Sequence, residues 1–175
     1  KFGLARAVSY LFRRHLYDIN LPTQEGICPI HFACESGNYE TVVAVIRTKK
    51  VRIRARVKEG DFKNRTALHF ACLSGNPNII NLILDSDERL GLDDVDESGK
   101  TPIIYAIEGD YVDCVNVLLG QEDIDIDQEY NGDNLLQYAC LKNKTKVFDA
   151  IINSIVFEPN QACSDGRQIL VIAIQ

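Results

Sequence analysis

The chain has 175 residues, of which 46% are hydrophobic and 25% are charged, and its formal net charge is −6. This composition is typical of a soluble, foldable chain that forms one domain or one short repeat array. No run of about 18 apolar residues occurs, which argues against a membrane span. The charge is uneven, because residues 1–60 hold 11 basic and 5 acidic side chains whereas residues 61–175 hold 8 and 20.

The first residues do not read as a secretory signal, because Arg6, Arg13 and Arg14 interrupt their apolar positions. Methionine is absent from the whole chain, including its first position, and we therefore expect a piece of a longer protein. The six cysteines form no C-x-x-C pair. We expect free thiols, which predicts a reducing, cytoplasmic location.

A short motif recurs along the chain. It reads GICPIHFAC from Gly26, NRTALHFAC from Asn64, GKTPIIYA from Gly99 and GDNLLQYAC from Gly132, and a fifth copy starts at Gly166. The column Cys28, Thr66, Thr101, Asn134 and Gln168 is spaced by 38, 35, 33 and 34 residues. A second stretch with helical apolar spacing follows each of the first four copies, as in Val42, Val45 and Ile46.

With its period near 33 residues and with Thr101-Pro102 and Thr66-Ala67-Leu68-His69 in the motif, the chain resembles the ankyrin-repeat family along nearly its whole length. The resemblance implies an all-α solenoid of stacked helix–turn–helix units with extended inter-repeat loops. We expect Gly37 to make the bend between two helices, and Asp110 and Asn143 to replace glycine there, since Asp and Asn tolerate positive φ best.

The predicted array is a single domain over residues 1–175. Its parts are the end of a preceding repeat (1–20), repeat 1 with a basic insertion (21–58), repeat 2 (59–95), repeat 3 (96–128), repeat 4 (129–162) and the start of a truncated repeat 5 (163–175). Helices this short are marginal alone, so each repeat must bury its apolar face on its neighbours.

The basic insertion is the most distinctive segment. About five extra residues lie between Ile46 and Asn64, and seven cations occur over twelve residues: Arg47, Lys49, Lys50, Arg52, Arg54, Arg56 and Lys58. From Val51 to Lys58 apolar and basic residues alternate, so an extended strand would place four cations on one side. Three interpretations stay open: a solvated excursion, a docking surface for an acidic protein segment, and a polyanion site for nucleic acid or anionic lipid.

Residues at three recurring columns of the motif could be functional sites or part of the hydrophobic core. His31 and His69 share one register, and the resemblance implies that they bond the turn backbone across repeats. Cys34, Cys72 and Cys140 share another, where a small buried side chain suits close helix packing, and we predict no metal. The rings of Phe32, Phe70, Tyr105 and Tyr138 share a third; they are either half-buried packing or an exposed ladder for a partner.

We predict a protein–protein interaction module and not an enzyme, without a cofactor or a small-molecule substrate. The resemblance implies partner contacts at the loop tips and at exposed first-helix positions. These are Gln24, Glu25, Ile27, Glu35, Ser36, Phe62, Lys63, Arg65, Leu73, Ser74, Glu97, Ser98, Lys100, Glu108, Tyr130, Asn131, Asp133, Leu141 and Lys142. If these positions are on the surface, replacing Arg65 and Lys100 by Glu leaves the melting temperature nearly unchanged. The alternatives are a polyanion-binding adaptor and the targeting arm of a larger enzyme or channel.

Overall fold

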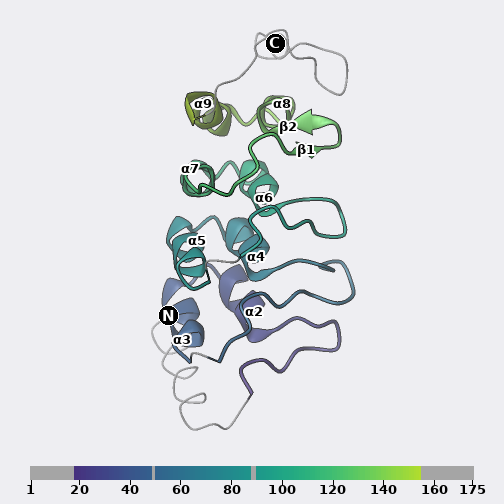
Figure 1. The fold of residues 1–175 in the computed structure, drawn as a ribbon, viewed down its shortest axis with the longest axis vertical. Helices are drawn as coiled ribbons and strands as arrows, with labels where there is room; N and C mark the ends of the chain where they lie inside the picture. Colours follow the sequence, from purple (N-terminus) through teal and green to yellow (C-terminus); the bar gives the residue numbers. More distant parts are fainter. Residues whose placement is uncertain (1–17, 49, 88–89, 155–175) are drawn as a thin grey trace.

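The computed structural model describes residues 18–48, 50–87 and 90–154, in which helices stack in two parallel columns (Figure 1). The inner column holds α2 (Pro29–Glu35), α4 (Ala67–Ser74), α6 (Pro102–Glu108) and α8 (Leu135–Leu141). The outer column holds α3 (Tyr39–Ile46), α5 (Pro77–Leu84), α7 (Val112–Leu119) and α9 (Thr145–Ser154). The predicted helical solenoid is confirmed. No helix in the described part of the chain is long and apolar enough to cross a bilayer.

Each inner helix begins at the same column of the motif. The N-cap residues Cys28, Thr66, Thr101 and Asn134 all have extended backbone angles. Proline follows in α2 and α6, where its fixed φ suits the first turn and its missing N–H costs nothing. The outer helices α3 and α5 begin after Asn38 and Asn76, whose side chains accept backbone N–H groups of the first turn.

A residue with positive φ makes the bend between the inner and outer helix of each helix pair that the structure describes. The φ angles are 64° at Gly37, 69° at Gly75, 57° at Asp110 and 55° at Asn143. The prediction that Asp110 and Asn143 replace glycine at this bend is therefore confirmed. The left-handed region is costly for most residues, and Asp and Asn are the non-glycine residues that enter it most readily.

We expect Gly75→Ala to destabilise the array more than Gly37→Ala does. Both substitutions place a Cβ atom at positive φ, which costs about 1 kcal/mol. At Gly75 the added Cβ would also lie 2.7–2.8 Å from the ring of Tyr111, whereas at Gly37 its nearest neighbour is 3.7 Å away. The exposed Tyr111 ring must move to admit this atom, so urea denaturation should show a larger loss for Gly75→Ala. Equal losses would show that the Tyr111 contact has no energetic weight.

A hairpin, here called a finger, precedes each inner helix and projects away from the two columns (Figure 1). The fingers span residues 23–27, 57–65, 96–100 and 129–134, and the last contains the antiparallel strands β1 (Glu129–Tyr130) and β2 (Asp133–Asn134). Thr23 and Asp96 pair with residues four positions on, whereas Val57 pairs with Arg65, eight positions on. Most of the extra residues between the first and second copies of the motif therefore lie in the second finger and not in the basic segment before it.

Neighbouring fingers are joined through their backbones. The carbonyl of Glu25 accepts the N–H groups of Lys58 and Glu59, and the carbonyl of Lys63 accepts the N–H of Glu97. These three bonds link the first finger to the second and the second to the third. The first three fingers consequently form a continuous edge, along which their tips follow one another in a fixed order.

The core lies between the columns and between successive repeats. Ile30, Leu68 and Ile103 occupy one register of the inner helices and are fully buried. The alanine column Ala33, Ala71, Ala106 and Ala139 is also buried, which fits the close packing of α2 on α4 and of α4 on α6. Each repeat thus buries its apolar side on the next one, as a one-dimensional stack requires.

Candidate protein-binding surface

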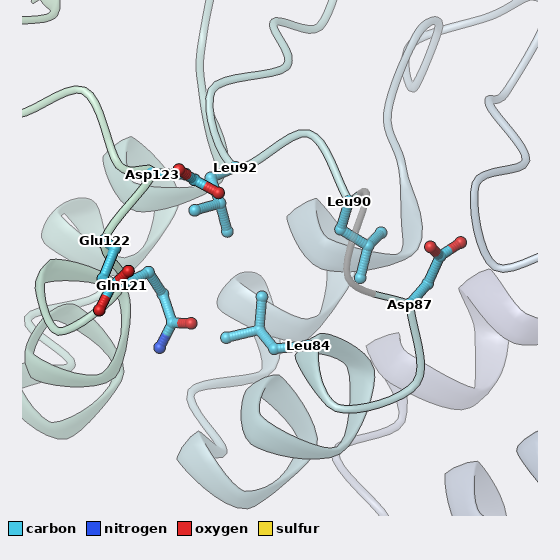
Figure 2. Close-up of a pocket in the computed structure, with 7 residues that line it drawn as sticks. All are labelled: Leu84, Asp87, Leu90, Leu92, Gln121, Glu122 and Asp123. Carbon is cyan, nitrogen blue, oxygen red and sulfur yellow. The ribbon is translucent and has the colours of Figure 1, made fainter.

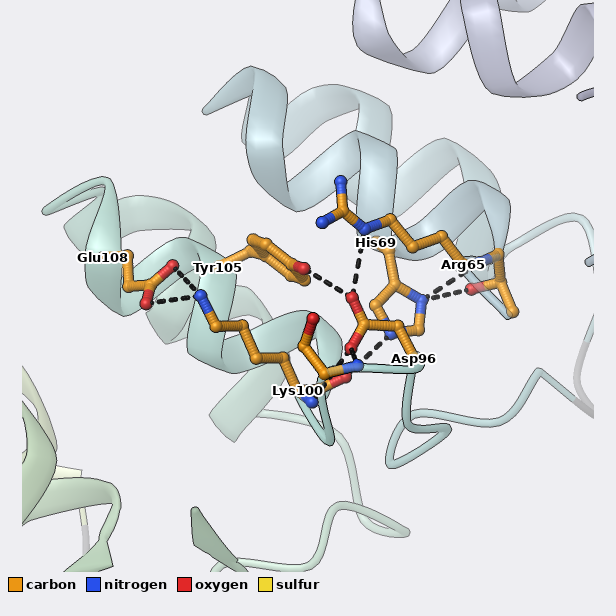
Figure 3. Close-up of polar contacts among 8 residues, drawn as sticks. Arg65, His69, Asp96, Lys100, Tyr105 and Glu108 are labelled. Carbon is orange, nitrogen blue, oxygen red and sulfur yellow. Dashed lines mark hydrogen bonds and ion pairs between the residues drawn. The ribbon is translucent and has the colours of Figure 1, made fainter. Parts of the chain in front are cut away.

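A buried carboxylate, that of Asp96, joins the second finger to the third repeat (Figure 3). The Asp96 side chain is 2% exposed, and its Oδ2 atom accepts hydrogen bonds from Arg65 Nε, at 3.0 Å, and from the hydroxyl of Tyr105 on α6. Its Oδ1 atom accepts the backbone N–H groups of Ser98 and Lys100 at 2.8 and 3.1 Å. Charge-assisted bonds of this kind are strong, and four donors satisfy the buried charge.

A second carboxylate, that of Glu108 on α6, joins the third repeat to the fourth. Lys100 Nζ donates to Glu108 Oε1 and Oε2 at 2.7 and 2.8 Å, and the hydroxyl of Tyr138 on α8 donates to Oε1 at 2.7 Å. The surface between the fingers and the inner helices, here called the finger-side face, therefore carries one connected polar network across repeats 2, 3 and 4.

The network sets the charge state of its members. Burial alone would raise the pKa of Asp96, but the bonds from Tyr105, from the Lys100 backbone and from Arg65 outweigh it and hold this pKa below its usual value. Burial also opposes ionisation of Glu108, yet the bonds from Lys100 and Tyr138 lower its pKa. Burial and then the carboxylate partner raise the pKa of the Tyr105 and Tyr138 hydroxyls. At neutral pH both carboxylates are ionised and both tyrosines keep their protons.

The aromatic column of the inner helices is covered in three repeats and open in one. Phe70, Tyr105 and Tyr138 are 1%, 5% and 4% exposed, whereas Phe32 is 49% exposed. Finger rings cover two of them at edge-to-face geometry, Phe62 over Phe70 and Tyr130 over Tyr138. The column is therefore mostly packing, and the exposed ladder predicted as its alternative is wrong except at Phe32.

Cations from the fingers cover the remaining ring, that of Tyr105. The Arg65 guanidinium lies 4.7 Å and the Lys100 ammonium 5.1 Å from its centroid. Such contacts stabilise by about 0.5–1 kcal/mol at exposed sites and by more when they are desolvated. Among the described residues, no ring or cation covers Phe32 in the same way.

The basic segment is not a strand, because it contains a turn at Ile53–Arg54. The predicted alternation is nevertheless present: Ile53 and Val57 are buried, and the basic residues between them are exposed. Two of these cations contact the following repeat, Arg54 through a bidentate pair with Asp87 and Arg56 through a 2.6 Å contact with Asp94.

The ion pairs form a row between residues 54–65 and residues 87–97, one repeat later. Its members are Arg54–Asp87, Arg56–Asp94, Lys63–Glu97 and Arg65–Asp96. Arg47, Lys50, Arg52 and Lys58 are exposed and make no ion pair within the described ranges, while Lys49 lies outside them. Part of the charge predicted for a polyanion is thus already neutralised by the chain itself.

The two histidines have the structural role that the resemblance implied. Nδ1 of His31 and of His69 accepts the backbone N–H of the N-cap residue at 3.1 Å. Nε2 of His31 lies 2.9 Å from the carbonyl of Ala55, and Nε2 of His69 lies 3.1 Å from that of Lys100. In repeat 4 the side chain of Gln137 bonds the N-cap in the same way. These contacts support the structural role of the histidines. Each one caps its own helix and also contacts the following inter-repeat segment.

The cysteine column is packing. Cys34 and Cys72 are fully buried, and burial raises the pKa of both thiols, which makes them poor nucleophiles and poor metal ligands. Cys140 at the same register is half-buried. In the described part of the chain, no three His, Cys, Asp or Glu side chains converge to hold an ion.

The repeats seen in the structure match a known sequence family. The sequence model described as ankyrin repeats (3 copies) matches residues 1–94 and again residues 54–130. The chain belongs to the ankyrin-repeat family. Ankyrin repeats are generally protein–protein interaction modules, and the fold is typically non-catalytic.

Three similar proteins show the range of the family. The chain is 26% identical over 137 residues to an ankyrin repeat protein of Acanthamoeba polyphaga mimivirus, covering 78% of this chain and 17% of the viral protein. It is 28% identical over 124 residues to the Target of rapamycin complex 2 subunit AVO2 of Saccharomyces cerevisiae, covering 70% of this chain and 28% of the yeast protein. The crystal structure of the ankyrin repeat domain of Bcl-3 has a TM-score of 0.75 and 23% identity, covering 98% of this chain and 73% of that one. The chain therefore spans less than a third of these two sequence relatives, and the Bcl-3 likeness supports the fold alone.

The ankyrin array places most of the predicted contact residues on or near its surface. The exposed ones are Gln24, Glu25, Glu35, Ser36, Leu73, Glu97, Ser98, Asn131 and Lys142. The half-buried ones are Phe62, Lys63, Arg65, Ser74, Lys100, Glu108, Tyr130 and Leu141. Whether any of them touches a partner stays a prediction.

Two predicted contact residues of the ankyrin array, Ile27 and Asp133, are buried, with 7% and 4% exposure, and the assumption that they are on the surface is wrong. Both immediately precede the N-cap residue, at a position where the finger backbone is paired. The other residues in this column, Arg65 and Lys100, have side chains only 13% and 19% exposed. The expectation that Arg65 and Lys100 are surface positions without a structural role is likewise wrong, because each side chain bonds a carboxylate of the network.

Asp96 was missed as a member of this surface. Its sequence context carried a signal, since Asp followed by Gly three residues later is typical of a turn. The turn was therefore predictable, but the bonds to Arg65 and Tyr105 depend on how repeats stack.

A shallow pocket of about 270 Å³ lies between the second and third repeats of the ankyrin array (Figure 2). Its lining combines Leu84, Leu90 and Leu92 with Asp87, Gln121, Glu122 and Asp123. Asp87 is engaged by Arg54, and the remaining acids are exposed. The lining residues of this pocket include no paired nucleophile and base.

Proposed function

We propose that this ankyrin array is a protein–protein interaction module that holds a partner protein with its finger tips and its finger-side face. The observation that supports the proposal most is the ordered finger edge. The backbones of the first three fingers are bonded to one another, and residues of the second and third fingers belong to the Asp96 and Glu108 network. A backbone that is already ordered loses little conformational entropy on binding, which favours affinity.

The tips themselves are solvent-exposed and chemically varied. Gln24 lies on the first finger and Glu97 and Ser98 on the third, and none of them contributes to the core. This division between a fixed base and changeable tips is what a surface specific for one partner requires. One relative is by name a subunit of a complex, and a role of this type is the one that we propose.

The proposal predicts that truncating the tips weakens partner capture without unfolding the array. The triple variant Gln24→Ala, Glu97→Ala and Ser98→Ala should capture its partner at least about tenfold less well, because individual hot-spot truncations cost about 1 kcal/mol or more. Capture from a cell extract followed by titration of the purified partner measures this effect.

The matched control carries Glu40→Ala, Asn81→Ala and Asn116→Ala, which are exposed positions of the outer helices α3, α5 and α7. It should bind as the unmodified chain does. Circular dichroism should show the same helical content for both triple variants. Binding lost in the outer-helix variant and kept in the tip variant would place the partner on the opposite side and refute the proposal.

A further inference from the structure

Repeat 3 shows how a cation is held on the finger-side face. Tyr105 and Glu108 are three residues apart on α6, so they share one side of the helix. The Lys100 ammonium lies 5.1 Å from the Tyr105 ring centroid and bonds both oxygens of Glu108 at 2.7 and 2.8 Å. A ring and a carboxylate at this spacing therefore form a seat for one basic side chain.

Repeat 1 carries the same pair at the same register. Phe32 corresponds to Tyr105, and Glu35 corresponds to Glu108, each at an identical distance from its N-cap residue. Repeats 2 and 4 do not, because Leu73 and Leu141 replace the carboxylate. Ring and carboxylate are thus combined only in repeats 1 and 3 of the four helix pairs that the structure describes.

The seat in repeat 1 has no occupant among the described residues. The residue that would supply the cation, in the column of Lys100, is Ile27, and it is buried. Phe32 is 49% exposed, Glu35 is exposed, and no ion pair or ring contact of either side chain occurs in the described ranges. The third repeat of the same chain shows the chemistry that would fill this position.

We propose that Phe32 and Glu35 bind a lysine or arginine side chain of the partner protein, with the cation over the ring and paired with the carboxylate. This inference rests on the proposed function and names the chemistry of one contact. Glu25, on the finger that precedes α2, is also exposed and adds negative charge to the first repeat. The partner segment is therefore basic at the point where it crosses the first repeat.

The test uses short peptides as probes of this chemistry. The full chain is titrated with the acetylated, amidated peptide Ala-Arg-Ala-Arg-Ala while the phenylalanine ring signals are followed by NMR. Two matched peptides replace arginine by citrulline, which keeps the shape and removes the charge, or by leucine. The Phe32 signals should shift and saturate with the arginine peptide, and both matched peptides should bind roughly threefold or more weakly, the size expected for an exposed cation–π contact with an ion pair.

Variants identify the site. Phe32→Leu and Glu35→Gln should each weaken the arginine peptide by roughly threefold, whereas Glu40→Gln on the outer helix α3 should not change it. Both replaced side chains are exposed, so unfolding curves should stay the same. Equal binding of the citrulline or leucine peptide, no saturating shift at Phe32, or unchanged binding in both variants would overturn the inference. The finger-tip variant keeps Phe32 and Glu35, so a failed titration leaves the capture result for the proposed function standing.

Discussion

Replacing Asp96 by alanine is expected to destabilise the array by about 3–5 kcal/mol, the usual cost of removing one partner from a buried charge pair. The substitution leaves the guanidinium of Arg65 and the hydroxyl of Tyr105 without their acceptor and frees the N–H groups of Ser98 and Lys100. Differential scanning calorimetry should show the melting temperature falling by roughly 10 °C.

Glu97→Ala is the matched control, because it removes a neighbouring carboxylate that is exposed. Glu97 pairs with Lys63 at 2.8 Å, and their side chains are 54% and 42% exposed. Exposed pairs contribute about 1 kcal/mol or less, so this variant should melt close to the parent. If the two variants lose similar stability, the buried network does not hold the repeats together.

The second large effect is a loss of stability in acid that depends on His69. Burial lowers the pKa of His69 to about 4, partly offset by its bond to the Lys100 carbonyl and by the charges of Asp96 and Asp94, with Arg65 acting in the lowering direction. The folded pKa lies below the unfolded value of about 6.5. The unfolded state therefore binds the proton first, and stability falls as the pH drops from about 6.5 to 4, by roughly 3 kcal/mol.

His69→Gln should remove most of this pH dependence at a small cost at neutral pH. The chain already uses glutamine at this register, since Gln137 accepts the Asn134 N–H at 2.8 Å. Urea unfolding at pH 7, 5.5 and 4.5 compares the two proteins. Burial also lowers the pKa of His31, but this contribution is the same in the parent and in the variant. Parallel pH profiles for parent and variant would contradict the assignment.

The carboxylates act in a different pH range. Asp96 and Glu108 have lowered pKa values, so their stabilisation is present above the unfolded carboxyl pKa of about 4 and is lost as the pH falls below it. Burial raises the pKa of Asp93, and the charge of Asp125 adds to this rise. Protonation of Asp93 therefore favours the folded state in acid. The parent and the His69→Gln variant share these groups, so the difference between their stability profiles with pH isolates the contribution of His69.

Local chemistry made much of the fold predictable. The helix starts follow from the N-cap column, the bends from residues that tolerate positive φ, and the burial of the histidine and cysteine columns from their common register. The alternation from Val51 to Lys58 also predicted which side chains are buried, although the segment turns at Ile53–Arg54 and is not a strand. The helix starts and the bends are decided by residues close to one another in the chain, whereas the columns are recognised by comparing one repeat with the next.

The finger-side face was less predictable because it is made between repeats. Arg65 and Lys100 read as exposed tip residues, yet they contact carboxylates eight to 31 residues away, on the next finger or helix. Replacing both by Glu therefore places new carboxylates against Asp96 and Glu108, and the double variant should lose stability instead of melting like the parent. A side chain's neighbours in a stack depend on finger length, which the motif spacing alone does not determine.

The row of ion pairs makes the junctions between repeats unequal. Four ion pairs bridge residues 54–65 to residues 87–97. At the following junction Asp93 accepts hydrogen bonds from the Asp125 N–H and the Gln128 side chain, while the charge of Asp125 repels its carboxylate. Dissolved salt screens attraction and repulsion alike, so raising the ionic strength loosens the first junction and relieves the second. We therefore expect the ionic strength to change which junction between repeats opens first.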